Sequence, residues 1–304
     1  MKHKNFFQRM TMSLSDLEQY HRQQRKMRFE SGDRPKNIKL REMCYPIFRT
    51  FLMVDRLFRK QKITIINPPP KEKKQVIFAC THIAQNDLEN VYEILGRGCW
   101  WFVGDPCFMY REISGLFVYL NGVIFLDTGY KDDRHISYLR ALDLLKAGGS
   151  LMIYPEGARN GSQNLLVMPL FSGTAKMASI NNIPVIPVAV EQYNNRFVIN
   201  FGNELHPKDF KNIDELNQTL RDAMATLKWT IWEQEGLQLR ADIPNGYKEK
   251  FTEEFGKRLY PYDTLESVER TRYHTKEELE QRDAFAHLDK LIPCKENAFL
   301  FRKR

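Results

Sequence analysis

The chain has no long uninterrupted apolar run. Its most apolar window, residues 43–58, is broken by Arg49, Asp55 and Arg56, whereas a membrane-spanning helix needs roughly 18 uncharged residues in succession. We therefore expect no transmembrane helix. The N-terminal residues also lack the apolar core and cleavage site of a signal peptide, so we expect a cytoplasmic location.

Cysteine is scarce, and the usual catalytic signatures are missing. The five cysteines include no Cys-x-x-Cys pair, which fits a reducing compartment and excludes a disulfide scaffold. There is no Gly-x-Ser-x-Gly elbow of a serine hydrolase, no Walker loop and no His/Cys cluster with metal-ligand spacing. The composition is nevertheless that of a folded protein, since 42% of the 304 residues are hydrophobic and 12% are aromatic.

Positive charge is concentrated near the N-terminus. Residues 1–74 contain 19 Lys and Arg against 7 Asp and Glu, although the whole chain carries a net charge of only +8. No nucleic-acid module accompanies this charge. Residues 41–60 mix aromatic and aliphatic side chains with arginines, as a helix lying on an anionic membrane surface would. A helix that packs on the core with its basic residues facing water would show the same pattern.

The remaining patterns indicate an α/β fold with a central mixed β-sheet flanked by helices, an N-terminal helical segment and a helical C-terminal extension. Short β-branched and aromatic runs predict buried strands, and they lie at residues 76–80, 100–103, 123–126, 151–154, 185–190 and 197–201. Leucines spaced three apart predict a helix that ends at Gly148 and Gly149. Further helices are expected over 174–180, 214–239 and 275–291.

A proline-rich stretch at residues 67–70, followed by charged residues, is typical of a solvated linker. It separates a basic helical region over 1–70, a candidate for membrane interaction, from a main domain over 71–240. The charge-rich last sixty residues form a third part, an extension over 241–304.

His82 and Asp87 are the first candidates for chemistry. On a regular helix a five-residue spacing would put them about 140° apart around the axis, so their pairing requires a bend. A buried strand ends at Cys80 and a helix would begin at Asn86 or Asp87, which supplies that bend. A carboxylate on one ring nitrogen fixes the imidazole tautomer and leaves the other nitrogen to take a proton from an attacking hydroxyl or amine.

A second block, Tyr154-Pro155-Glu156-Gly157-Ala158-Arg159-Asn160, follows another predicted strand. Together the two blocks resemble the glycerolipid acyltransferase family, the bacterial 1-acylglycerol-3-phosphate acyltransferases and their relatives, whose motifs are His-x4-Asp and Phe-Pro-Glu-Gly-Thr-Arg-Ser. Residues 121–127 and 183–188 also resemble blocks of that family in order and spacing. The resemblance covers roughly residues 75–202.

The resemblance implies direct transfer of a fatty acyl group from an acyl thioester, of acyl-carrier protein or coenzyme A, with no metal or further cofactor. His82 would be the general base and Asp87 its orienting partner. Glu156, Gly157 and Arg159 would line the acceptor pocket, where a guanidinium can hold an anion. Together with the basic and aromatic N-terminal segment, the resemblance implies a peripheral position at the inner face of the membrane. No pattern indicates an oligomeric state.

Two departures from the family pattern concern the acceptor. Thr128 stands where the family has an arginine that helps to bind the acceptor's phosphate, and Ser172 replaces the lysine of a Phe-Lys-x-Gly segment. Lys131 and Arg134 are candidates to replace the lost charge. The acceptor is therefore either lysophosphatidate or a related lysolipid, or a non-phosphorylated amino acid, amine, sugar or natural-product hydroxyl. A non-catalytic lipid-binding protein on the same fold is a third hypothesis.

Overall fold

The computed structural model describes residues 6–72, 74–104, 106, 109–111, 113–162, 165–239, 242–261, 263–275 and 300–301. Beyond residue 275, the helix predicted over 275–291 lies outside these described residues. In the described part of the chain, no helix is long and apolar enough to cross a membrane.

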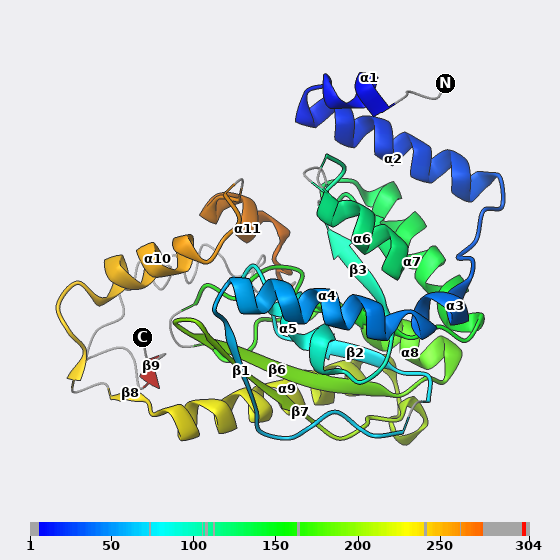
Figure 1. Cartoon of the computed structure of the whole chain (residues 1–304). Coiled ribbons are helices and arrows are strands. Elements are labelled where there is room, and N and C mark those ends of the chain that lie inside the picture. Colours follow the sequence, from blue (N-terminus) through cyan, green and yellow to red (C-terminus); the bar gives the residue numbers. More distant parts are fainter. Residues whose placement is uncertain are drawn as a thin grey trace.

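A mixed seven-stranded sheet forms the centre of the molecule (Figure 1). Its strand order is β1-β7-β6-β2-β5-β3-β4, and all neighbouring pairs are parallel except β6 with β7. The bounds are β1 (Lys62–Ile65), β2 (Ile77–Cys80), β3 (Trp100–Gly104), β4 (Val123–Leu126), β5 (Leu151–Ile153), β6 (Val185–Tyr193) and β7 (Arg196–Phe201). The six predicted strands are confirmed as β2 to β7.

Both faces of the sheet are covered by helices because the central strands are apolar on both sides. Strand β2 illustrates this: Phe78 and Cys80 join the apolar cluster beneath the helices of one face, whereas Ile77 and Ala79 join the cluster on the other. The first face carries α4 (Tyr45–Phe58) and α5 (Asp87–Ile94), and the second carries α7 (Lys131–Lys146), α8 (Gly173–Asn181) and α9 (Ile213–Glu235).

Helical segments flank the sheet domain at both ends, as predicted. The N-terminal helices are α1 (Phe6–Met10), α2 (Leu14–Glu30) and α3 (Ile38–Met43), which precede α4; α6 (Ile113–Asn121) follows β3. The C-terminal helices are α10 (Tyr247–Lys257) and α11 (Leu265–Thr271). A short 3-10 helix η1 (Pro207–Asp209) precedes α9, and β8 (Gln238–Leu239) pairs with β9 (Leu300–Phe301).

Two details differ from the sequence prediction. Strand β1 lies within the region expected to be helical, and it pairs in parallel with β7 at the edge of the sheet. Most of its four residues, Lys-Ile-Thr-Ile, are exposed at the sheet edge, so they lack the continuous apolar pattern of the central strands and depend on pairing with β7. Helix α9 ends at Glu235 and not at Leu239, because Gly236 has φ +84° and leaves the helical region. The predicted domain limits stay predictions.

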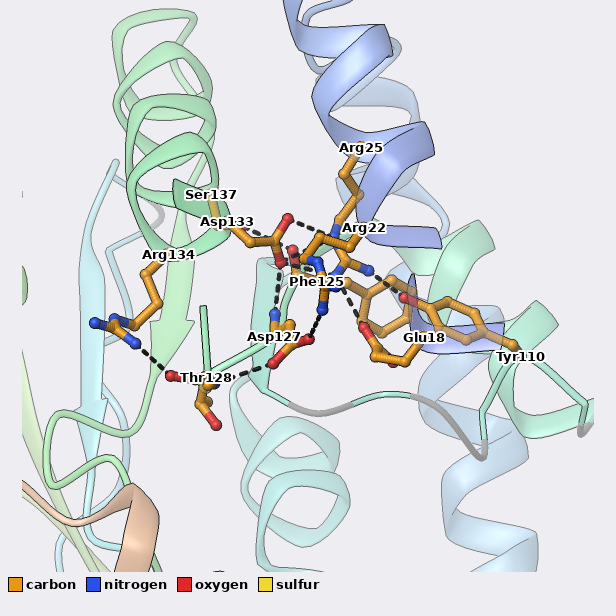
Figure 2. A network of polar contacts seen from close by, with 11 residues as sticks. Glu18, Arg22, Arg25, Tyr110, Phe125, Asp127, Thr128, Asp133, Arg134 and Ser137 are labelled. Atoms are coloured by element: carbon orange, nitrogen blue, oxygen red, sulfur yellow. Dashed lines mark hydrogen bonds and ion pairs between the residues drawn. The ribbon is translucent and has the colours of Figure 1, made fainter. Parts of the chain in front are cut away.

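Buried ion pairs attach α2 to α7 and to the end of β4 (Figure 2). Arg25 Nη2 lies 2.7 Å from Asp133 Oδ2, and the side chain of Asp133 is only 1% exposed. Asp133 also accepts the backbone N–H of Asp127 at 2.6 Å, and Arg22 pairs with Asp127 at 2.6 Å. These contacts hold the N-terminal region next to Thr128.

Candidate active site

The candidate site lies where parallel strands β2 and β5 end side by side. His82 follows β2 by two residues, and Asp87 is the first residue of α5. The bend between strand and helix brings the two side chains together, and Nδ1 of His82 lies 2.7 Å from Oδ2 of Asp87. The predicted pairing is therefore present in the structure.

Asp87 is fully buried and is held by backbone donors as well as by the imidazole. Its Oδ2 accepts the N–H of Ile83 at 2.8 Å and that of Ala84 at 3.1 Å. A carboxylate anchored in this way accepts the Nδ1–H of His82, which leaves the lone pair on Nε2. The His82 side chain keeps 19% exposure, so an acceptor can approach that nitrogen.

Tyr154 is a further contact of the pair. Its hydroxyl donates to Asp87 Oδ1 at 3.2 Å, and its ring lies 4.3 Å from the His82 ring, centroid to centroid. Tyr154 comes from the end of β5, in the second sequence block. It thus links the two blocks at the site, a role that the sequence did not predict.

The electrostatics of the pair suit a neutral base beside an ionised carboxylate. Burial lowers the pKa of the His82 imidazole below its ordinary value, and the charge of Arg159 acts in the same direction, although the Asp87 carboxylate opposes both. Burial alone would raise the pKa of Asp87, but His82 and the Ile83 N–H outweigh it, so this pKa is lowered. At neutral pH the site therefore holds a neutral imidazole.

This direction of shift predicts the pH dependence of activity. A base with a lowered pKa stays unprotonated further into the acid range, and activity is lost only as the pH falls through that lowered pKa. The acid limb of kcat/KM should therefore have its midpoint below 6.5, the ordinary imidazole value. A rate profile over about pH 4.5–8 measures it. A midpoint above 6.5 would contradict the assignment of His82 as a buried base.

Glu156 supports the loop that carries His82. It is fully buried, and its two oxygens accept the backbone N–H of His82 at 3.3 Å and that of Met168 at 2.8 Å. The Asn160 N–H donates to the His82 carbonyl at 2.7 Å, so the second block is tied to the first on both sides of the histidine. This geometry gives Glu156 a positioning role, and its predicted contact with the acceptor stays a prediction.

Gly157 occupies a position that only glycine can fill. Its φ is +73°, and a Cβ there would stand 2.3 Å from Cε2 of Phe171. Phe171 in turn donates its N–H to the Pro155 carbonyl at 2.9 Å. The segment that includes Ser172 therefore lies directly against the second block. Ser172 is the N-cap of α8 and makes no capping hydrogen bond with its side chain.

Arg159 reaches back over the first block and forward to the C-terminal extension. Its Nε donates to the Ala84 carbonyl at 3.4 Å, and its Nη1 lies 2.6 Å from Oδ2 of Asp263. The guanidinium also lies over the ring of Tyr260, 5.0 Å from the centroid. Neither Tyr260 nor Asp263 was among the predicted site residues, because no motif or spacing marks the extension.

Thr128 lies just past β4, two strands away from β5, which is roughly 10 Å at the usual strand spacing. Arg134 donates to the carbonyl of Thr128 (Figure 2), so a guanidinium does stand beside the position of the missing arginine. Both Arg134 and Lys131 are exposed. Within the described residues, neither bonds to Arg159 or to its partners.

The fold and the sequence both match known acyltransferases. The solved structure of the 1-acyl-sn-glycerophosphate (LPA) acyltransferase PlsC from Thermotoga maritima superposes with a TM-score of 0.52 at 17% identity, covering 68% of this chain and 86% of that chain. This likeness establishes the fold. The model of the Acyltransferase family matches residues 60–191, a range that contains His82, Asp87 and Arg159.

Two curated proteins are similar in sequence. One is the 1-acyl-sn-glycerol-3-phosphate acyltransferase of Saccharomyces cerevisiae, 25% identical over 143 residues, which are 47% of each chain. The other is an uncharacterized acyltransferase of Schizosaccharomyces pombe, 23% identical over 175 residues, or 54% of this chain and 62% of that protein. The chain thus spans about half the length of the first and under two thirds of the second. Residues 60–191 match the Acyltransferase family, and the chain is similar in sequence and in fold to 1-acyl-sn-glycerol-3-phosphate acyltransferases.

Proposed function

We propose that the protein transfers a fatty acyl group from an acyl thioester to the hydroxyl of a lysolipid, with His82 as general base. The observation that carries this proposal is the buried His82–Asp87 hydrogen bond of 2.7 Å at a partly open edge of the site. The match of residues 60–191 to the Acyltransferase family supports it.

The chemistry requires only the residues present. Nε2 of His82 removes the hydroxyl proton as the acceptor oxygen attacks the thioester carbonyl and forms the new C–O bond. The tetrahedral intermediate collapses with cleavage of the C–S bond, and the departing sulfur takes the proton back from Nε2. Asp87 stabilises the imidazolium between these steps. The donor is the thioester of coenzyme A or acyl-carrier protein, and no metal or further cofactor takes part.

The test is release of free thiol from acyl-coenzyme A and, in parallel, from acyl-carrier protein, with a panel of lysolipids as acceptors. The proposal predicts release that depends on an acceptor. A protein that binds lysolipid but releases no thiol from either donor would instead be the non-catalytic lipid-binding protein considered above.

We also propose that α4 places the site at a membrane surface. One side of α4 packs on the core through Phe48 and Leu52. The helix also exposes large apolar side chains, namely Ile47, Phe51, Val54, Leu57 and Phe58, and an open groove lies along Ile47, Phe51 and Val54. Arg49 and Lys60 are exposed nearby. Apolar side chains next to exposed cations fit an anionic lipid surface.

Replacing Ile47 and Leu57 with aspartate should weaken binding to vesicles that contain anionic lipid by at least about tenfold, because each buried aliphatic side chain contributes about 1.5–3 kcal/mol. Cosedimentation of protein with vesicles measures this. Ile180, 63% exposed on α8 at the opposite face of the sheet, provides the matched control, and Ile180→Asp should bind normally. Equal binding by all variants would rule out this surface.

A further inference from the structure

The C-terminal extension contributes side chains to the candidate site. We propose that Asp263 is a specificity-determining residue: it makes the site select an acyl acceptor whose head group carries no net charge, in preference to a phosphate monoester. This inference rests on the proposed acyl transfer and goes beyond it by naming the acceptor class.

The extension is fixed to the loop between His82 and Asp87. Gln85 Nε2 donates to the Leu259 carbonyl at 2.7 Å, and the Tyr260 hydroxyl donates to the Gln85 carbonyl at 2.7 Å. An apolar cluster adds to this attachment and joins the second sequence block to α10 and α11; it consists of Ala158, Met168, Tyr247, Phe251, Phe255, Leu259 and Val268. The contacts of Leu259 and Tyr260, just before Asp263 in the chain, and the packing of Val268, just after it, therefore hold Asp263 at the site.

The pair of Arg159 and Asp263 is close and mostly shielded from water. The two side chains are 12% and 22% exposed, and their charged atoms are 2.6 Å apart. Asp263 also lies near enough to His82 for its charge to act on the imidazole, in the direction that raises the histidine pKa. The Arg159 charge acts on the same imidazole in the opposite direction, so both members of the ion pair lie close to the proposed base.

The local charge decides which head group fits. A phosphate monoester carries a charge of about −1.5 to −2, and it would meet an arginine that Asp263 already neutralises, together with the repulsion of the Asp263 carboxylate. Thr128 and Ser172 add no positive charge, and Arg134 lies at the Thr128 carbonyl. Placing that phosphate here would leave it poorly neutralised, which is costly away from water.

A head group without net charge meets neither difficulty. A zwitterionic head group can place its phosphate on Arg159 and its ammonium on Asp263, so that one internal ion pair is exchanged for two with the ligand. An uncharged glycerol head group leaves the Arg159–Asp263 ion pair intact and forms hydrogen bonds to its two side chains. Both classes keep the net charge of the site unchanged.

The test compares three lysolipids with the same acyl chain, below their micelle concentrations: lysophosphatidate, lysophosphatidylethanolamine and monoacylglycerol. The wild-type protein should show a higher kcat/KM with one or both of the last two than with lysophosphatidate. Asp263→Asn keeps the shape of the side chain but removes its charge, and it should raise the kcat/KM for lysophosphatidate at least tenfold relative to the preferred acceptor. A specific loss with lysophosphatidylethanolamine identifies the zwitterion as the acceptor.

Glu253→Gln is the matched control, because it removes one negative charge from α10 at a side chain that is 66% exposed. Glu253→Gln should leave the kcat/KM for lysophosphatidate, relative to that for the preferred acceptor, unchanged. A wild-type preference for lysophosphatidate that Asp263→Asn does not alter would overturn the inference and leave the acyl transfer standing.

If no lysolipid accepts an acyl group, the proposed function fails, and equilibrium binding of the same three lysolipids then decides on Asp263. Asp263→Asn should strengthen the binding of lysophosphatidate tenfold relative to that of the other two lysolipids. An unchanged ratio would overturn the inference by this route also.

Discussion

His82→Ala should lower kcat/KM for acyl transfer by about 10²–10⁴, the usual contribution of a positioned general base. Asp87 orients the imidazole toward the open edge of the site, since its Nδ1 is bonded to the carboxylate and its Nε2 is not. Without it, the acceptor hydroxyl would have to attack while still protonated. Release of thiol from the acyl thioester measures the loss.

The control for this variant is His135→Ala. His135 is exposed on α7, outside the loop that carries the pair, so its removal should leave the rate within about twofold. Equal melting temperatures would show that both variants are folded. If His82→Ala retains the wild-type rate, another group is the base, even though the fold is that of an acyltransferase.

Asp87→Asn should also cost much of the activity, up to about 10⁴ in kcat by analogy with other histidine–carboxylate pairs. The amide oxygen of the new side chain can still accept the Ile83 and Ala84 N–H groups, but it carries no charge to stabilise the imidazolium. The other amide atom is then an NH₂ group, which cannot accept the Tyr154 hydroxyl as the carboxylate does. The substitution also removes a negative charge from the first turn of α5, which destabilises a helix N-terminus. We therefore expect a lower melting temperature as well as a lower kcat.

Asp132→Asn separates these two effects, because Asp132 is an exposed acidic residue in the first turn of α7. It should show the helix-terminal effect on stability alone, with a normal rate. The orienting role of Asp87 would be refuted by an Asp87→Asn protein whose rate at saturating acceptor stays within twofold of the wild type.

The central sheet could be predicted because its strands are buried on both faces. Runs such as Ile77–Cys80 are continuously apolar and end at polar residues, which marks both their type and their limits. Strand β1 lacked that signal, since most of its residues are exposed at the sheet edge and it depends on pairing with β7.

The candidate site was predictable only where its residues belong to local motifs. His82 and Asp87 are brought together by one strand-to-helix bend, so the spacing carried the information. Tyr154 meets Asp87 across 67 residues, and Asp263 meets Arg159 across 104. Contacts of this kind depend on how distant elements pack, and a single sequence has no pattern for them. The contacts of Tyr154 and Asp263 therefore emerged from the structure alone.

The most direct test of the account is a single turnover of enzyme with labelled acyl thioester, followed by intact-protein mass spectrometry and product analysis. Direct transfer by His82 predicts one thiol and one acylated lysolipid for each thioester consumed, no acyl adduct on the protein, and no consumption when the lysolipid is left out. Thiol release of equal rate without a lysolipid, or an acyl group retained on the protein, would contradict it.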